Sequence, residues 1–261
     1  RFVTMEDFEN AKDKVMMGSE RRSMVLTDEQ KEKTAFHEAG HAVVGLTLPQ
    51  CDPVYKATII PRGGALGMVV SLPEIDRLNW HKEECEQKVA MTMAGKAAEI
   101  IKYGEGMVSN GPAGDIQQAS ALARAMVLRW GMSDKIGNID YSEAHEGYQG
   151  NTAGLSVSAH TKELIEDEVK RFIQEGYDTA YRILTERKDE WERLANGLLE
   201  YETLTGEEIK RVMAGEPPHA DDDDDGAAGE VEKKPSVTAI PKTKPKAKPS
   251  GDGGLEPEPT A

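Results

Sequence analysis

The chain has 261 residues and a formal net charge of −15, with 38% hydrophobic residues and two cysteines. The acidic balance excludes a uniformly basic face for nucleic acid and argues against direct docking on anionic lipid. The cysteines form neither a C-x-x-C pair nor a disulfide framework, which indicates a reducing compartment. No apolar run reaches the length of a membrane span. We therefore expect a soluble fragment that binds no nucleic acid, and its first residue, Arg1, indicates a piece of a longer protein.

Apolar periodicity, capping boxes and glycine or proline stops predict a mainly helical chain. The expected helices cover residues 4–17, 27–48, 81–103, 115–130, 159–186, 188–201 and 205–213. Two β-branched segments, 54–60 and 66–72, flank a turn that contains proline and glycine, and they predict a hairpin. Residues 134–158 are polar and rich in glycine, which is typical of a long loop with room for one short strand. We therefore expect a mainly α fold with a small β-hairpin.

The two ends of the chain contribute least to the expected core. The first helix shows only a weak apolar face, formed by Phe8, Ala11 and Val15. From Glu216 onward the sequence has no usable apolar pattern, and it includes five consecutive aspartates and a lysine–proline alternation. Such a segment cannot bury enough apolar surface to offset the entropy of ordering it. We expect residues 215–261 to be disordered.

The helix predicted at residues 27–48 carries the candidate chemistry. Its second half is apolar on nearly every side, which is typical of a core helix. His37, Glu38 and His41 interrupt this apolar surface. Three ionisable side chains in a buried helix are costly unless they have partners, and a metal ion would supply one. The alternative is a metal-free core helix with two buried histidines and a salt-bridged glutamate.

The spacing of these residues is that of the H-E-x-x-H pattern of zinc peptidases. Residues four apart lie on one face of a helix, so the imidazoles of His37 and His41 can converge on one zinc ion. Glu38 lies one position round, within reach of a metal-bound water without being a ligand. It can accept the proton of that water and pass it to the leaving amine. Gly40, a costly residue in mid-helix, predicts that another backbone approaches closely there.

A catalytic zinc needs a third protein ligand beside one open position. The residues after His41 exclude the metzincin spacing, which would continue with a glycine and a third histidine. Glu99 lies on a following helix. Asp115 lies where a glycine-rich loop meets a helix start, where it would also serve as an ordinary N-cap. His81 is a weaker candidate, and spacing alone does not choose between Glu99 and Asp115.

Several separate motifs follow one another in an order that is typical of one protease family. The motifs are Thr34-Ala35-Phe36-His37-Glu38-Ala39-Gly40-His41-Ala42, Ile59-Ile60-Pro61-Arg62-Gly63, Ala65-Leu66-Gly67, Ala94-Gly95-Lys96-Ala97-Ala98-Glu99, Asp115-Ile116 and Trp130-Gly131-Met132-Ser133. Together they resemble the FtsH family of membrane-anchored, ATP-dependent zinc proteases, in a bacterial style. The resemblance covers roughly residues 1–214.

The resemblance implies a metal site made of His37, His41 and Asp115, with Glu38 as the catalytic base. The family's third ligand is an aspartate in a segment that opens a helix, which matches Asp115 and decides against Glu99. The family also uses a strand near its active site, where an extended substrate can add to a sheet edge. The candidates for that edge are Met68, Val69 and Val70.

The resemblance further implies a homohexamer in which an AAA ATPase module feeds unfolded or membrane proteins to the protease. The family implies a bacterial inner-membrane anchor in the full-length parent, with the catalytic domain on the cytoplasmic side. Residues 1–23 would then be the end of the ATPase module and a linker, 24–214 the zinc peptidase domain, and 215–261 the tail. No G-x-x-x-x-G-K-[ST] loop occurs in the sequence, so we expect one zinc ion per chain and ATP only in the parent.

Three positions depart from the family pattern. Gly114, Lys96 and Ile100 stand where asparagine, arginine and glutamate are usual. The proposed ligands and base are intact, so we expect peptide hydrolysis. The competing hypothesis is a non-catalytic assembly module in which zinc is only structural.

Overall fold

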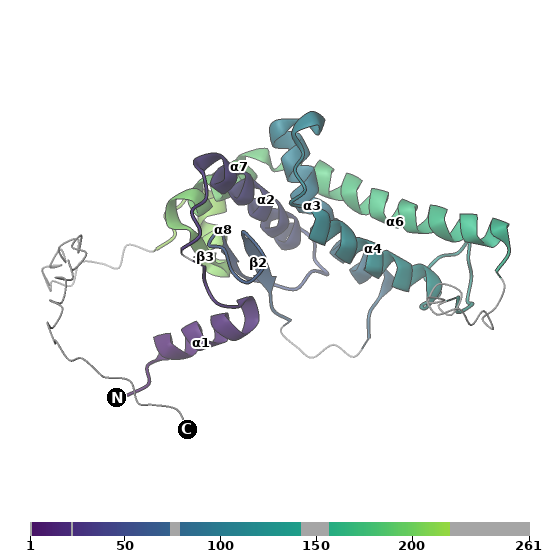
Figure 1. Ribbon diagram of the computed structural model, residues 1–261, viewed down its shortest axis with the longest axis horizontal. Coiled ribbons are helices and arrows are strands. Elements are labelled where there is room, and N and C mark those ends of the chain that lie inside the picture. The colour runs from purple at the N-terminus through teal and green to yellow at the C-terminus, as the bar shows by residue number, and fades with distance from the viewer. Residues whose placement is uncertain (1, 22, 74–78, 142–156, 220–261) are drawn as a thin grey trace, which may run out of the picture. The chain divides into compact units, whose positions relative to one another are not determined.

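The computed structural model describes residues 2–21, 23–73, 79–141 and 157–219 of the chain. Its helices are α1 (Met5–Met17), α2 (Asp28–Thr47), α3 (Lys82–Tyr103), the short 3-10 helix η1 (Glu105–Met107), α4 (Ala113–Leu128), α6 (Ala159–Glu186), α7 (Lys188–Tyr201) and α8 (Gly206–Ala214). Its strands are β1 (Val54–Thr58), β2 (Met68–Ser71) and β3 (Thr203–Thr205). The predicted mainly helical fold with a small sheet is confirmed (Figure 1). In the described part of the chain, no helix is both long and apolar enough to cross a membrane.

Local sequence signals account for most helix boundaries. Capping boxes begin α1, α2 and α8, at Thr4, Thr27 and Thr205. Helices α6 and α7 have the predicted bounds. The predicted bounds of α4 are wrong, since it begins at Ala113 and ends at Leu128 instead of running from Asp115 to Trp130. Pro112 is the N-cap, and its fixed φ favours an earlier helix start, so Asp115 lies in the first turn.

The three strands form one antiparallel sheet in the order β2-β1-β3. Strands β1 and β2 are the arms of the predicted hairpin, with Ala57 opposite Val69. Strand β3, whose three residues lie between α7 and α8 and pair with β1, was not predicted. A strand this short shows no alternating pattern that distinguishes it from a turn. Because β2 pairs with β1 alone among the described strands, its outer backbone groups form a sheet edge.

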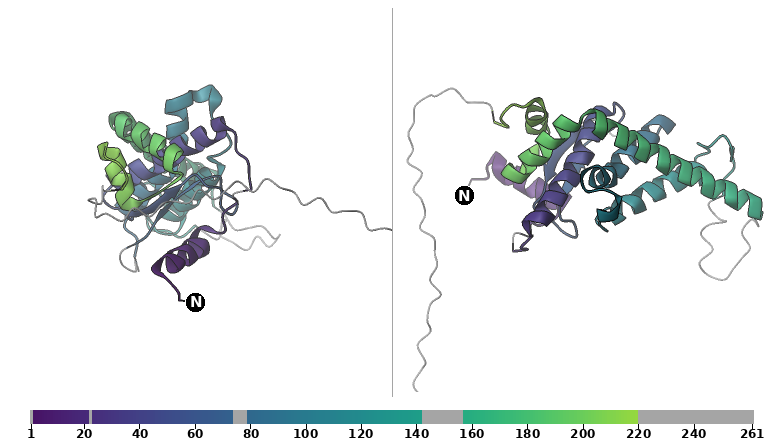
Figure 2. Two further views of the ribbon diagram at one scale, coloured as in Figure 1. Left: turned by 90° about the vertical axis from the view of Figure 1, so that its left-hand side faces the viewer. Right: turned by 90° about the horizontal axis from the view of Figure 1, so that it is seen from above.

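Helix α3 joins two hydrophobic clusters. One cluster packs α2, α7, α8 and β1 with α3, and the other packs α3 with α4 and the long helix α6, which lies alongside both (Figure 2). Helices α2 and α3 approach each other closely at Gly40. A Cβ added there would lie 2.8 Å from Ala98 Cβ and 3.0 Å from the Ala94 carbonyl oxygen. The backbone approach predicted at Gly40 is confirmed. On its other side, α2 accepts a 2.9 Å hydrogen bond from Trp191 Nε1 at the Phe36 carbonyl.

Helix α1 has its polarity reversed relative to an ordinary packed helix. The apolar face predicted for it faces solvent, with Phe8 64% exposed and Val15 86% exposed. Its polar face contacts the sheet instead, where Lys56 Nζ of β1 lies 2.5 Å from Asp13 Oδ2. The sheet therefore holds α1 through charged and polar groups and leaves Phe8 and Val15 uncovered in the described structure, whereas Met17 at the end of the helix is buried.

Two predicted segments fall partly outside the described residues. The expected loop 134–158 is described only at its two ends, where it contains no strand, and residues 142–156 lie outside. The expected disordered tail 215–261 is described only up to residue 219.

Candidate metal centre

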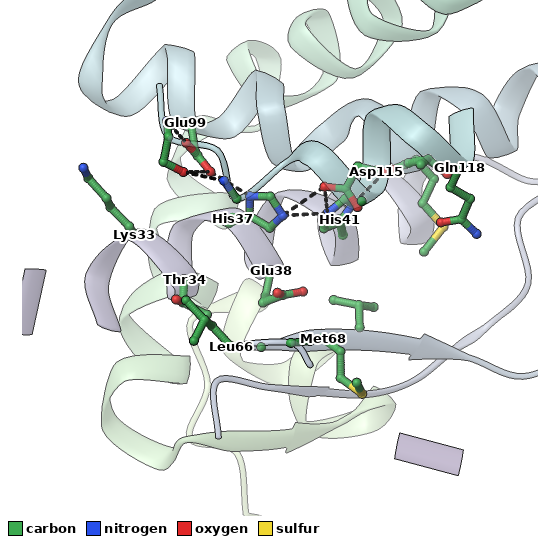
Figure 3. Close-up of a pocket in the computed structure, with 18 of the residues that line it drawn as sticks. Lys33, Thr34, His37, Glu38, His41, Leu66, Met68, Glu99, Asp115 and Gln118 are labelled. Carbon is green, nitrogen blue, oxygen red and sulfur yellow. Dashed lines mark hydrogen bonds and ion pairs between the residues drawn. The ribbon is translucent and has the colours of Figure 1, made fainter. Parts of the chain in front are cut away.

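Side chains from two helices meet in a cleft. Helix α2 supplies His37 and His41, and the first turn of α4 supplies Asp115. Ligand atoms of the three residues all lie within 4.8 Å of one another. The two histidine Nε2 atoms are 3.1 Å apart, and Asp115 Oδ2 lies 3.2 Å from His37 Nε2 and 3.5 Å from His41 Nε2 (Figure 3). The structure thus brings together the three residues that the sequence analysis named as ligands.

The Nδ1 atoms of both histidines point away from this centre and contact acceptors. His37 Nδ1 is 3.1 Å from Glu99 Oε1, and His41 Nδ1 is 2.8 Å from the carbonyl oxygen of Met91. A carbonyl oxygen only accepts, so His41 Nδ1 carries the proton, and an ionised Glu99 imposes the same tautomer on His37. In the neutral form, which is the form that binds a metal, each imidazole therefore directs the lone pair of its Nε2 atom at the centre.

Three electron-pair donors to a metal thus face one another. Two Nε2 lone pairs and a carboxylate at these distances repel one another unless a cation or protons lie between them. The buried Oδ2 of Asp115 receives no hydrogen bond of ordinary geometry from the described residues. Two imidazoles and a carboxylate form a ligand set of catalytic zinc sites that keep a fourth position open. The residues present therefore fit a divalent metal ion.

The electrostatics of the cluster agree with this fit. Burial lowers the pKa of His37, but the carboxylates of Asp115 and Glu99 outweigh burial and raise that pKa to about 10. Burial raises the pKa of Asp115, yet His37 and His41 hold it well below its ordinary value. The protein therefore draws positive charge to this point, which is the role that a metal ion fills.

Glu38 lies beside the cluster without joining it. It is 6% exposed, and Figure 3 shows its carboxylate pointing into the cavity between the histidines and β2. Burial is the main cause that raises the pKa of Glu38, which suits a group that must both accept and release a proton. The chain just before β2 passes close by, because a Cβ at Gly67 would lie 2.9 Å from Glu38 Oε1.

Gly95 of α3 leaves the space that the two imidazoles occupy. A Cβ at this position would lie 2.4 Å from both Cε1 and Nε2 of His37, and 2.6 Å from His41 Nε2. Gly95 belongs to one of the motifs that resemble the protease family, but no role was predicted for it. The available signal was its position in the middle of a helix. The same signal predicted a close backbone approach at Gly40.

The two other candidate ligands lie elsewhere. Glu99 lies behind His37 and contacts the nitrogen that points away from the centre. Burial opposes ionisation of Glu99, but hydrogen bonds from His37 and Ser109 lower its pKa. His81 is the N-cap of α3 and does not belong to the metal-binding group of the described residues. Glu99 therefore orients the His37 imidazole, in the way that outer carboxylates do at many metal sites.

The cluster opens into a cleft of about 1110 Å³. Its walls come from α2, β2, α3, α4 and the loops before β2 and α4. Met68 and Val69, two of the three predicted substrate-binding residues, line the cleft, whereas Val70 is not among the described residues that line it. Strand β2 nevertheless forms a sheet edge beside the cleft, as noted above.

Comparison with known proteins identifies the family. A model described as peptidase family M41 matches residues 24–212. The chain belongs to this family. The M41 domain is therefore a peptide hydrolase by descent, and the structure places its H-E-x-x-H helix at the cleft.

Curated relatives extend this finding. The chain is 48% identical over 231 residues to the ATP-dependent zinc metalloprotease FtsH of Caulobacter vibrioides, covering 87% of this chain and 37% of the relative. It is 46% identical over 247 residues to the protein of the same name in Rickettsia bellii, covering 93% and 39%. The corresponding Haemophilus influenzae protein is 44% identical over 220 residues, covering 83% and 35%. The chain thus spans little more than a third of the length of these relatives.

Proposed function

We propose that this M41 domain is a zinc endopeptidase in which His37, His41 and Asp115 hold one zinc ion and Glu38 is the general base. The observation that carries the proposal is the convergence of two Nε2 lone pairs and a buried carboxylate oxygen on one point. The relatives are named zinc metalloproteases, which supports zinc as the metal.

The side chains of the site have distinct roles in peptide hydrolysis. A bound zinc ion supplies Lewis acidity, which acidifies a coordinated water and polarises the scissile carbonyl. Glu38 accepts the proton of the attacking water and then delivers it to the leaving amine. Glu99 and the Met91 carbonyl keep the imidazoles in the tautomer that leaves Nε2 free to bind metal. The buried setting of Glu38 keeps solvent from competing for the proton.

The edge of β2 is our candidate for substrate binding, through Met68, Val69 and Val70. An extended peptide that adds to this edge forms main-chain hydrogen bonds, which depend little on its sequence. The position of the edge beside the cleft, with Gly67 against Glu38, supports this assignment. A substrate bound in this way must be unfolded over several residues, which agrees with a protease for unfolded or misassembled proteins.

The parent protein is proposed to be an ATP-dependent, membrane-anchored homohexamer, since the relatives are named ATP-dependent and are much longer than this chain. We assign residues 1–23 to the end of the ATPase module and a linker, 24–214 to the peptidase domain, and 215–261 to a tail. The uncovered apolar face of α1 supports the first assignment, because a neighbouring module would bury it. We place the catalytic domain on the cytoplasmic side of the bacterial inner membrane.

Glu38→Gln tests the proposed chemistry. The variant should bind one zinc ion per chain, because Glu38 is not a ligand, and should lose casein hydrolysis. Glu32→Gln, on the same helix and paired with Lys102, is the matched control and should retain activity. Casein cleavage by Glu38→Gln would contradict the mechanism. Bound zinc without turnover in the unmodified chain would favour the structural-zinc hypothesis instead.

A further inference from the structure

The position of Asp115 depends on the loop that precedes α4. Residues 104–112 connect α3 to α4, and the N-cap residue Pro112 makes no side-chain hydrogen bond to the helix start. Gly111 and Gly114 lie on either side of that start, and glycine gives the backbone little stiffness. Another contact must therefore fix where the first turn of α4 presents its carboxylate to the histidines.

Ser109 ties this loop to Glu99. Its backbone N–H donates to Glu99 Oε2 at 2.9 Å, and its hydroxyl donates to Glu99 Oε1 at 3.2 Å. The same hydroxyl accepts a 3.0 Å hydrogen bond from the backbone N–H of Gly111, which folds the loop toward the start of α4. Glu99 is 3% exposed, so water would not freely replace the hydrogen bonds from Ser109 if they were removed.

The same carboxylate holds the first ligand of α2. Glu99 Oε1 lies 3.1 Å from His37 Nδ1, so one buried side chain connects the α2 ligand with the loop that leads to the α4 ligand. We propose that Ser109 is a positioning residue that, through Glu99 and Gly111, sets the place of Asp115 and thereby the affinity of the site for zinc. The inference rests on the proposed zinc site and assigns a further residue to it.

The serine hydroxyl can be removed without removing the backbone bond. Ser109→Ala deletes the two hydroxyl bonds and should weaken zinc binding about 10-fold, which is typical when a group that orients a ligand is lost. Ser109→Thr keeps a hydroxyl and should restore most of the affinity. Ser120→Ala is the matched control, because Ser120 lies on α4, the helix that carries Asp115, but lines a separate hollow between α4 and α6.

The experiment measures zinc affinity by chelator competition in the full chain carrying Glu38→Gln, which prevents self-cleavage. Thermal melts of the metal-free variants check that each one folds. Absence of zinc binding in the parent would overturn the proposed function itself. Zinc binding in the parent, with equal affinities for Ser109→Ala and Ser120→Ala, would overturn only the role of Ser109.

A double-mutant cycle tests whether Ser109 acts through Asp115. In an Asp115→Asn background, adding Ser109→Ala should change zinc affinity by less than about twofold, since the ligand that Ser109 positions is already impaired. An unchanged loss of about 10-fold in that background would show that the effect bypasses Asp115 and would refute the proposed route.

Discussion

Replacing Gly95 with alanine tests the geometry of the metal site from the α3 side. The added Cβ would lie 2.4 Å from His37 Nε2 and 2.6 Å from His41 Nε2. Optimal contacts between such atoms are about 3.5–4.0 Å, so an imidazole or the helix must move by about 1 Å. Helix α3 is packed on both sides by buried clusters, so we expect the imidazoles to take most of the displacement.

This displacement should affect function more than folding. Moving a catalytic group by about 1 Å costs on the order of 100-fold in rate, and we expect zinc affinity to fall by about 10- to 100-fold. Alanine is favoured over glycine inside a helix by up to about 1 kcal/mol, which offsets part of the overpacking. Gly95→Ala should therefore fold with α3 intact and bind zinc more weakly.

The assay is zinc affinity by chelator competition, with a thermal melt of the metal-free protein. Gly176→Ala is the matched control, because its Cβ would press on α3 at 2.7 Å from Val89 Cγ1 and 3.1 Å from Ala90 N without touching a ligand. It should lower the melting temperature and leave zinc affinity unchanged. A Gly95→Ala protein that binds zinc as tightly as the unmodified chain would refute the inferred packing.

Three further predictions concern pH and packing. Zinc must displace a proton from His37, because the pKa of His37 is raised to about 10. Zinc affinity should therefore rise about tenfold per pH unit near neutrality. An affinity that calorimetry shows to be independent of pH would contradict this. Hydrogen bonds from Arg171 above all lower the pKa of Glu168 from 4.5 to about 2, so its stabilisation is full above pH 4.5 and is lost as the pH falls toward 2. In urea titrations, the unfolding free energy of Glu168→Gln should therefore fall less steeply with decreasing pH than that of the unmodified chain. Trp191→Phe removes the indole N–H that donates to the Phe36 carbonyl, together with part of a fully buried side chain. It should cost about 1–3 kcal/mol of unfolding free energy, and unchanged urea stability would argue against that bond.

Local signals in the sequence predicted the helices well because those signals are themselves local interactions. The Thr27 hydroxyl accepts from the Gln30 N–H, so the capping box that indicated the start of α2 also forms it. Strand β3 has no such signal, since pairing with β1 across almost 150 residues of chain defines it. The exposure of the apolar face of α1 was also invisible, because periodicity shows that a face exists and not what covers it.

The part of the candidate site that lies on a single helix could be predicted from the sequence. His37 and His41 are four residues apart, and helix geometry alone places both imidazoles on one face. Glu99 and Asp115 could not be separated by spacing, because both approach the same imidazole of His37 from different elements. An imidazole has two nitrogens, and only the tertiary structure shows that Asp115 faces Nε2 while Glu99 faces Nδ1. The family resemblance favoured Asp115, and the geometry supports that proposal.

The other half of the site follows a spacing that mirrors the first. Met91, Gly95 and Glu99 are four residues apart on α3, so they form one stripe along that helix. This stripe faces the stripe of His37 and His41: the Met91 carbonyl meets His41, Glu99 meets His37, and Gly95 leaves room between them. The pairing runs in opposite directions along the two helices, so it requires α2 and α3 to be antiparallel at one register. Close packing of small residues at the α2–α3 contact sets that register, and a shift by one helical turn would place the Glu99 carboxylate away from His37 Nδ1. The polar site and the apolar contact are therefore products of the same helix register.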